Sequence, residues 1–225
     1  MSSRRSRSPF RLRNAGQRDV EVFMDLIRHA DPDHPSPFHA ARLTLSLPPE
    51  PPLSHQLDLC LIAEDQRGKA VGALVAGPPE WLVAHPGLQN SALLLDLVHR
   101  ITMIHGVAVA PRYRGRGIGR ALIRQVEQRY RALGWGLSML IHAPSLATYY
   151  ERLGYVSHPA LLMNLPSPHP LIGQDFLDML TALKPLSPDV RLADVAFAPA
   201  PVISGVLPGS QVPEHAWFDG AGLCY

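Results

Sequence analysis

The apolar residues in the middle of the chain are spaced as in alternating strands and helices. Residues 101–109 form an apolar run that predicts a buried strand. After it, apolar side chains recur every four residues on one face of a predicted helix over 118–133, and Gly134 follows as its C-cap. A strand over 137–141 and a helix over 145–153 complete the pattern of this segment.

The first third of the chain carries similar patterns. They predict a strand over 10–13, helices over 19–29 and 38–47, and two strands over 57–63 and 70–76. Gly68 lies between the last two strands, which indicates a hairpin turn. Together these elements predict an α/β (α+β) fold, in which helices pack on a mixed sheet.

Proline divides the chain into parts, because it interrupts helices and inner strands. Ten of the 23 prolines follow residue 156. We therefore expect a basic flexible tail over 1–9, a folded domain over 10–165 and a proline-rich C-terminal extension over 166–225. Residues 161–165 are expected to pair with a strand that opens at Tyr155. One amphipathic helix is expected in the extension, from the spacing of Phe176, Leu177, Leu180 and Leu183.

Composition narrows the class of protein. A chain of 225 residues that is 46% hydrophobic can bury a sizeable core. No apolar run is long enough to cross a bilayer, and the basic, polar N-terminus does not resemble a secretory signal. Two cysteines, Cys60 and Cys224, make neither a disulfide framework nor a cysteine-rich zinc site. We expect a reduced, cytoplasmic protein without a metal.

The positive charge is concentrated in one segment. The net charge is only +2, but residues 100–131 hold eight arginines against one acid, Glu127. Arginine presents a planar fork that suits phosphate groups. The segment therefore predicts a basic surface whose partner carries phosphate.

A glycine-rich turn lies inside this basic segment. Residues 107–122 read V-A-V-A-P-R-Y-R-G-R-G-I-G-R-A-L, so Gly115, Gly117 and Gly119 stand between a strand and a helix N-terminus. Backbone amides at such a turn can bind phosphate. The P-loop pattern is excluded because no Gly-Lys-Ser/Thr is present. The dinucleotide fingerprint is excluded because Arg120 stands where its last glycine or alanine is required.

The pattern that remains is Arg/Gln-x-x-Gly-x-Gly/Ala, which Arg114, Gly117 and Gly119 satisfy. With the preceding V-A-V-x-P strand and the later Y-Y-E-R-L-G-Y at 149–155, the chain resembles the GNAT superfamily of acyl-CoA-dependent N-acyltransferases over about residues 10–165. The resemblance implies a mixed, mostly antiparallel central sheet flanked by helices.

The resemblance also implies where acetyl-CoA binds. Pantetheine would pair with the backbone of Val107 and Val109 in a gap between two splayed strands. The pyrophosphate would be held by the turn and the helix start, namely Arg114, Gly115, Arg116, Gly117, Ile118, Gly119 and Arg120. Arg112, Arg116 and Arg124 are open candidates for the 3′-phosphate.

The catalytic residues are implied in the same way. Tyr150 matches the family tyrosine that protonates the departing thiolate, and Tyr149 is then the tyrosine expected to pack in the core. His105 is the candidate base, because some arylalkylamine-acetylating members of the family carry a histidine at this position, two residues before Val107. Strand alternation places it on the same face as Val107 and Val109. Further candidates for the base or the acceptor site are His142, Asp96, Glu80 and His99.

Two features depart from the family pattern. Ser145 stands near the position where many relatives have an asparagine that binds pantetheine, and it could substitute for that residue or cap the helix. The extension over 166–225 could cover the acceptor groove, cross to a second subunit in a homodimer or remain mobile. We expect it to lie outside the CoA site.

The predicted function is an N-acetyltransferase that moves an acetyl group from acetyl-CoA to a primary amine by direct attack in a ternary complex. The acceptor would be a small-molecule amine or a peptide N-terminus. A non-catalytic acyl-CoA-binding regulator is the alternative. A nucleic-acid-binding module is disfavoured, because the basic segment has no interleaved aromatics and no known DNA-binding motif, and no membrane partner is expected.

Overall fold

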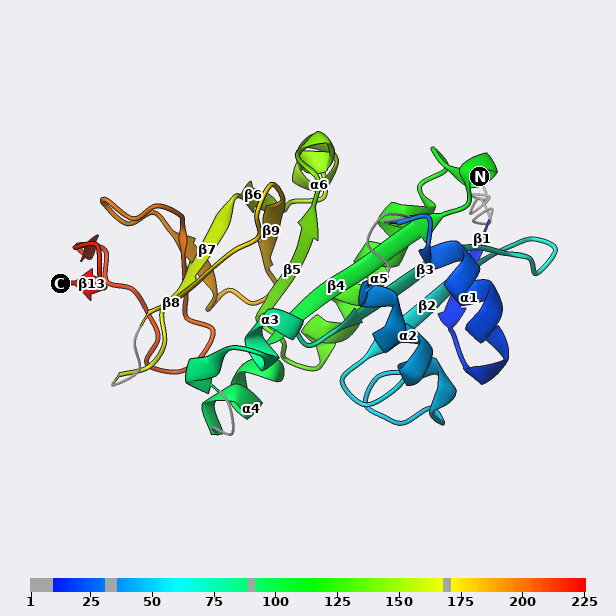
Figure 1. Ribbon diagram of the computed structural model, residues 1–225, viewed down its shortest axis with the longest axis horizontal. Helices are drawn as coiled ribbons and strands as arrows, with labels where there is room; N and C mark the ends of the chain where they lie inside the picture. The colour runs from blue at the N-terminus through cyan, green and yellow to red at the C-terminus, as the bar shows by residue number, and fades with distance from the viewer. Residues whose placement is uncertain (1–9, 31–35, 89–91, 168–170) are drawn as a thin grey trace, which may run out of the picture. The chain divides into compact units, whose positions relative to one another are not determined.

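The computed structural model describes residues 10–30, 36–88, 92–167 and 171–225 (Figure 1). The tail predicted over 1–9 lies outside these residues. The chain forms two compact units. The N-terminal unit comprises Met1–Gly77 and His105–Val126, and the C-terminal unit comprises Pro78–Ile104 and Glu127–Tyr225.

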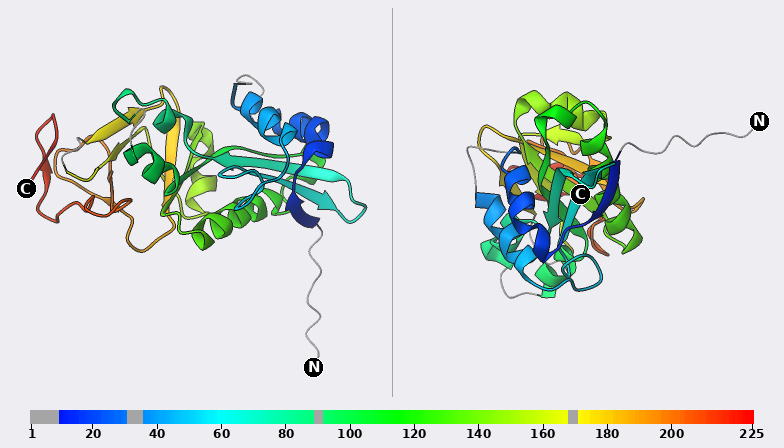
Figure 2. Two further views of the ribbon diagram at one scale, coloured as in Figure 1. Left: turned by 90° about the horizontal axis from the view of Figure 1, so that it is seen from below. Right: turned by 90° about the vertical axis from the view of Figure 1, so that its right-hand side faces the viewer.

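The N-terminal unit is a sheet with helices on both faces. Its strands run in the order β1-β2-β3-β4, and β2 pairs antiparallel with both β1 and β3. Helices α1 and α2 cover one face, and the start of α5 lies on the other (Figures 1 and 2). The bounds are β1 Phe10–Asn14, η1 Gln17–Asp19, α1 Val20–Ile27, α2 Ser36–Ser46, β2 Leu59–Asp65, β3 Ala70–Gly77, β4 Ile101–Val109, η3 Pro111–Tyr113 and α5 Ile118–Ala132.

Each face of this sheet has its own packing. Phe23 and Ile27 of α1 are fully buried with Ile62 of β2, so the apolar stripe of the helix covers alternate residues of the strands. On the opposite face, a Cβ atom at Gly72 would lie 3.0 Å from Ile118 Cγ2. A glycine in β3 therefore lets the first turn of α5 pack directly on the strand.

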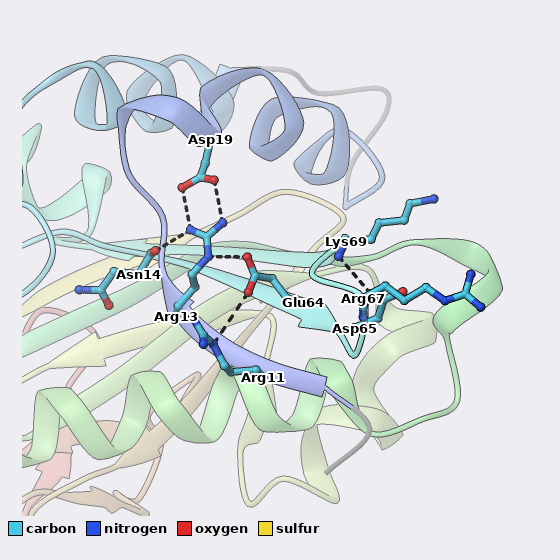
Figure 3. Close-up of polar contacts among 8 residues, drawn as sticks. All are labelled: Arg11, Arg13, Asn14, Asp19, Glu64, Asp65, Arg67 and Lys69. Carbon is cyan, nitrogen blue, oxygen red and sulfur yellow. Dashed lines mark hydrogen bonds and ion pairs between the residues drawn. The ribbon is translucent and has the colours of Figure 1, made fainter. Parts of the chain in front are cut away.

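A network of ion pairs joins the first strand to its neighbours. The Arg13 guanidinium donates hydrogen bonds of 2.7 and 2.8 Å to the two carboxylate oxygens of Asp19, and its Nε donates to Glu64 Oε1 at 2.6 Å (Figure 3). Asp19 Oδ2 also accepts the Gly16 amide at 2.9 Å. The arginine thus ties β1 to the entry of α1 and to β2.

The network predicts a pH-dependent stability. The hydrogen bond from Arg13 holds the pKa of Asp19 below its usual value. A depressed pKa contributes stability that is present above the unfolded pKa, about 3.9, and is lost as the pH falls through the folded pKa. At pH 7 we expect Asp19→Asn to lower the free energy of unfolding by about 3 kcal/mol, the order found when one partner of a buried ion pair is removed.

Urea unfolding of both proteins at pH 7 and in acid tests this prediction. The gap between parent and Asp19→Asn should close once the pH is below the folded pKa of Asp19. Asp25→Asn is the matched control, because the Asp25 side chain is 70% exposed in its pair with Arg28 and should change stability by less than about 1 kcal/mol. An equal gap at both pH values would contradict the role of the Asp19 charge.

The C-terminal unit contains the other half of the mixed sheet. The first half of β4 pairs in parallel with β5, from Ile101 opposite Leu137 to Ile104 opposite Leu140. Strand β9 lies between β5 and β6 and is antiparallel to both. The bounds are α3 Glu80–Val83, η2 Pro86–Leu88, α4 Ala92–Val98, β5 Leu137–His142, η4 Pro144–Leu146, α6 Ala147–Glu151, β6 Val156–His158 and β9 Leu180–Pro185.

A second, smaller sheet in this unit is formed by strands that precede and follow β9 in the sequence. Its order is β10-β11-β7-β8, and a short hairpin of β12 and β13 follows. The bounds are β7 Ala160–Met163, β8 Ile172–Asp175, β10 Arg191–Ala193, β11 Val202–Ser204, β12 Trp217–Phe218 and β13 Leu223–Cys224. Val195, Val202 and Val212 are buried in the core of this region.

The predicted fold class is confirmed: the structure is mixed α/β, with a mostly antiparallel central sheet flanked by helices. Two predictions in the C-terminal part are wrong. The amphipathic helix is absent, because Leu177 and Asp178 have positive φ angles and form a turn that leads into β9. Residues 160–163 pair with β8 and β11 instead of β6, since β9 occupies the edge of β6. A chain cut after Leu165 would lose β9 from the central sheet.

Candidate functional site

In the second half of β4, alternate side chains are partly exposed and form one face of the strand. His105, Val107 and Val109 are partly exposed, whereas Gly106 and Ala108 between them are buried. This is the alternation that a strand requires, and it gives the three predicted residues one common face. The face leads directly into the glycine turn.

The turn that follows β4 is held to the neighbouring strand. The Ala110 amide donates a hydrogen bond of 2.9 Å to the carbonyl of Val71 in β3, and the short helix η3 then redirects the chain. Gly115 and Gly117 have φ angles of +75° and +80°. Glycine adopts this left-handed conformation readily, and other residues do so at a cost. Both glycines are therefore required by the backbone.

The amides of this turn are available to a ligand. The first helical hydrogen bond at the start of α5 runs from the Ala121 amide to the Gly117 carbonyl, at 3.0 Å. Over residues 10–30, 36–88, 92–167 and 171–225, the N–H groups of residues 115–120 find no hydrogen-bond acceptor. Unpaired amides at a helix N-terminus, with the positive end of the helix dipole, form an anion-binding site.

The arginine side chains of the turn are partly ordered by the turn itself. Arg114 Nε donates to the Val109 carbonyl at 3.1 Å. The Arg116 guanidinium lies 5.1 Å from the centre of the Tyr113 ring. The Val109 carbonyl, which was predicted to face pantetheine, therefore already accepts a hydrogen bond. The remaining arginines predicted for phosphate, Arg112, Arg120 and Arg124, are exposed.

A cavity of about 340 Å³ lies beside the turn. Its lining joins the tip of the β2–β3 hairpin to the turn and consists of Phe10, Asp65, Gln66, Arg67, Val71, Tyr113, Arg116 and Ile118. Tyr113 donates a hydrogen bond of 2.9 Å to Asp65 Oδ2, which fixes one wall. Arg67 has no sequence signal of its own, because only the folded hairpin brings it beside Arg116.

In the C-terminal unit, Tyr150 lies on α6 and only 6% of its surface is exposed. Its ring contacts those of His142 and Tyr155, at centroid distances of 4.8 and 6.1 Å. The hydroxyl makes no hydrogen bond to any residue in the described part of the chain. Burial raises the pKa of Tyr150, so the phenol stays protonated and able to donate.

The expectation that Tyr149 packs in the core is wrong. Tyr149 is 39% exposed, and Leu146, three residues earlier, is 45% exposed. Tyr150 and Leu153, again three residues apart, are buried. Residues at this spacing share one face of a helix, so the buried face of α6 is the one that carries Tyr150.

The other candidate residues of this unit have defined surroundings. His142 is buried, and its two ring nitrogens lie 2.8 Å from the Ala143 carbonyl and 2.9 Å from Ser157 Oγ. To act as a base it would have to leave these partners. Asp96, Glu80 and His99 are exposed. Ser145 lies within η4 and does not cap α6, whose N-cap is Leu146.

The described residues contain neither a cluster of metal-binding side chains nor a membrane-spanning helix. No group of three or more histidine, cysteine, aspartate or glutamate side chains is arranged to hold a metal ion there. No helix within those same residues is long and apolar enough to span a membrane.

Several solved acetyltransferases have the same fold. The GNAT family N-acetyltransferase YhbS from Escherichia coli, solved in complex with CoA, has a TM-score of 0.54 and 18% identity, covering 84% of this chain and 87% of that chain. Phosphinothricin acetyltransferase from Sinorhizobium meliloti, in complex with AcCoA, has a TM-score of 0.51 and 17% identity, covering 80% and 89%. The ribosomal-protein-S18-alanine N-acetyltransferase from Escherichia coli has a TM-score of 0.50 and 17% identity, covering 79% and 94%.

These identities are low, so the similarity to solved structures shows the fold alone. A comparison with curated protein sequences found no significant match. The sequence profile described as "Acetyltransferase (GNAT) family" matches residues 23–155, which include β4, the glycine turn and Tyr150. This match spans more than half of the chain, and the protein therefore belongs to the GNAT family of acetyltransferases.

Proposed function

We propose that this protein transfers an acetyl group from acetyl-CoA to a primary amine, by direct attack of the amine in a ternary complex. The observation that carries the proposal is the turn at residues 115–120, whose amides lack partners within the described residues and are surrounded by exposed arginines. Such a turn suits a pyrophosphate, and membership of the GNAT family supplies the reaction class.

The proposed acetyl-CoA site follows from this turn. The amides from Gly115 to Gly119, with Arg120, hold the pyrophosphate, whereas the Arg114 amide donates to the Pro111 carbonyl at 3.3 Å. The exposed face of β4 receives pantetheine at Val107 and Val109. Because the phosphates lie at the turn, the thioester end points back along β4 toward His105. The residues present fit an elongated ligand that carries negative charge at one end.

Two proton transfers are required of the protein. An acceptor amine arrives as an ammonium ion, and we assign the removal of its proton to the His105 imidazole, which becomes imidazolium and later releases the proton to solvent. The neutral amine then attacks the thioester carbonyl. The C–S bond breaks, and Tyr150 donates its hydroxyl proton to the departing thiolate. The second proton lost by the attacking nitrogen passes through solvent and restores the Tyr150 hydroxyl. The products are an amide, a free thiol and one proton.

An acceptor screen with acetyl-CoA tests the proposed function. Release of free thiol is measured with small amines, amino acids and peptides with free N-termini, and a reaction without acceptor measures simple hydrolysis. We expect acceptor-dependent thiol release. A chain that binds acetyl-CoA and releases thiol with none of the acceptors would instead be a non-catalytic acyl-CoA-binding protein.

The role of His105 is tested by the pH dependence of the rate. An imidazole must be neutral to accept a proton, so the parent should lose kcat/KM as the pH falls through the pKa of its base. We expect His105→Gln to remove this acidic limb and to lower kcat/KM by about 10²–10⁴ at neutral pH. An unchanged profile in His105→Gln would show that the base lies elsewhere, and His142 and Asp96 would be examined next.

A further inference from the structure

A carboxylate occupies space beside His105 that a side chain would normally fill. Asp58 lies directly before β2, and Gly77 is the last residue of β3. A Cβ atom at Gly77 would lie only 2.1 Å from Asp58 Oδ1, and 3.6 Å from His105 Nε2. All three residues belong to the N-terminal unit. The absence of a side chain at Gly77 thus brings the carboxylate and the imidazole to the same point.

The two carboxylate oxygens of Asp58 differ in their hydrogen bonds to the described residues. Thr44 Oγ1, from α2, donates a hydrogen bond to Asp58 Oδ2 at 3.2 Å. The Asp58 carbonyl accepts the His55 amide at 3.1 Å and Ser54 Oγ at 3.2 Å, which holds the backbone. Oδ1 accepts no hydrogen bond from any residue that the structure describes.

None of the described residues compensates the charge of Asp58. Asp58 makes no ion pair with any of the described residues, and it is half-buried. Burial raises the pKa of Asp58, because water solvates the carboxylate poorly there. A bound cation would reverse this effect, since an opposite charge nearby favours the ionised form. The site therefore suits a positively charged ligand.

We infer that Asp58 binds the ammonium group of the acceptor amine through Oδ1 and holds it beside His105 Nε2. This inference rests on the proposed function, and it names the acceptor class: amines that are cationic in solution. The ammonium donates one hydrogen bond to Asp58 and gives one proton to His105. The nitrogen that remains is neutral and lies where the thioester would be, at the end of the pantetheine proposed along β4.

Asp58→Asn tests the inference, because it removes the charge and keeps the shape. The probes are the most active amine from the acceptor screen and its hydroxyl analogue, which carries no charge and is measured as a competitive inhibitor. In the parent we expect the amine to bind more tightly than the alcohol. In Asp58→Asn we expect KM for the amine to rise about 10–100-fold, as for a lost hydrogen bond to a charged group, with the alcohol unaffected.

Gly77→Ala provides a second, independent test. A methyl group at this position would displace the Asp58 carboxylate, so KM for the amine should rise as in Asp58→Asn. In an Asp58→Ala background the space is free, and adding Gly77→Ala should change KM by less than about twofold. Gly16→Ala is the matched control, because a Cβ atom at Gly16 meets no atom within 4 Å. Acetyl-CoA affinity should be equal in all variants.

The outcomes separate the two proposals. A parent chain that acetylates no amine contradicts the proposed function and this assignment together. An active parent whose KM for the amine is unchanged by Asp58→Asn contradicts the assignment of Asp58 alone. If Asp58→Asn raises KM for the amine and weakens binding of the alcohol by the same factor, Asp58 has only a structural role. This result too would overturn the inference.

Discussion

Replacing Tyr150 with phenylalanine is expected to lower kcat by about 10²–10⁴, the usual contribution of general acid catalysis. The substitution removes only the hydroxyl and leaves the ring packed against His142 and Tyr155. The thiolate then departs without its proton donor. Steady-state kinetics give kcat, and calorimetry should show an unchanged dissociation constant for acetyl-CoA.

Tyr149→Phe is the matched control for this experiment. It removes the same hydroxyl from the adjacent residue, whose side chain is on the exposed face of α6, and kcat should stay within about twofold of the parent. A normal kcat in Tyr150→Phe would contradict the assignment, unless product release limits turnover. A burst of thiol in the first turnover would reveal slow product release.

Replacing Gly117 with valine is expected to abolish acetyl-CoA binding, with a dissociation constant raised at least ~100-fold. The φ angle of Gly117 is +80°, and a β-branched residue avoids this conformation. The backbone would therefore rotate and withdraw amides from the pyrophosphate. Calorimetry with acetyl-CoA measures the loss, and circular dichroism confirms that the variant is folded.

Gly134→Val is the control that separates binding from stability. Gly134 follows α5, has a φ angle of +90° and, like Gly117, has no atom within 4 Å of an added Cβ. Both variants should lose stability, by about 1–3 kcal/mol for the strained backbone. Only Gly117→Val should lose acetyl-CoA affinity. A folded Gly117→Val protein that binds as tightly as the parent would show that the phosphates bind elsewhere.

Strand β4, the glycine turn and helix α5 could be predicted from the sequence because their signals are local. The bounds of β4 agree with the apolar run over 101–109, and α5 begins at Ile118 as its four-residue spacing predicts. Gly134 and Gly154 have positive φ angles after the predicted helices. A few neighbouring residues suffice for each of these features, since periodicity and backbone conformation act over one or two turns.

Long-range packing decided the rest. The apolar spacing of Phe176, Leu177, Leu180 and Leu183 suits a helix or a strand, and only the pairing of residues 180–185 with β5 and β6 makes that segment a strand. The sequence predicts Tyr149 in the core, but the strands packed against α6 bury the adjacent Tyr150 instead. The meeting of Asp58, Gly77 and His105 joins three segments distant in sequence. Local sequence signals are therefore enough to identify the candidate cofactor turn, whereas only the folded chain brings a carboxylate to the proposed base.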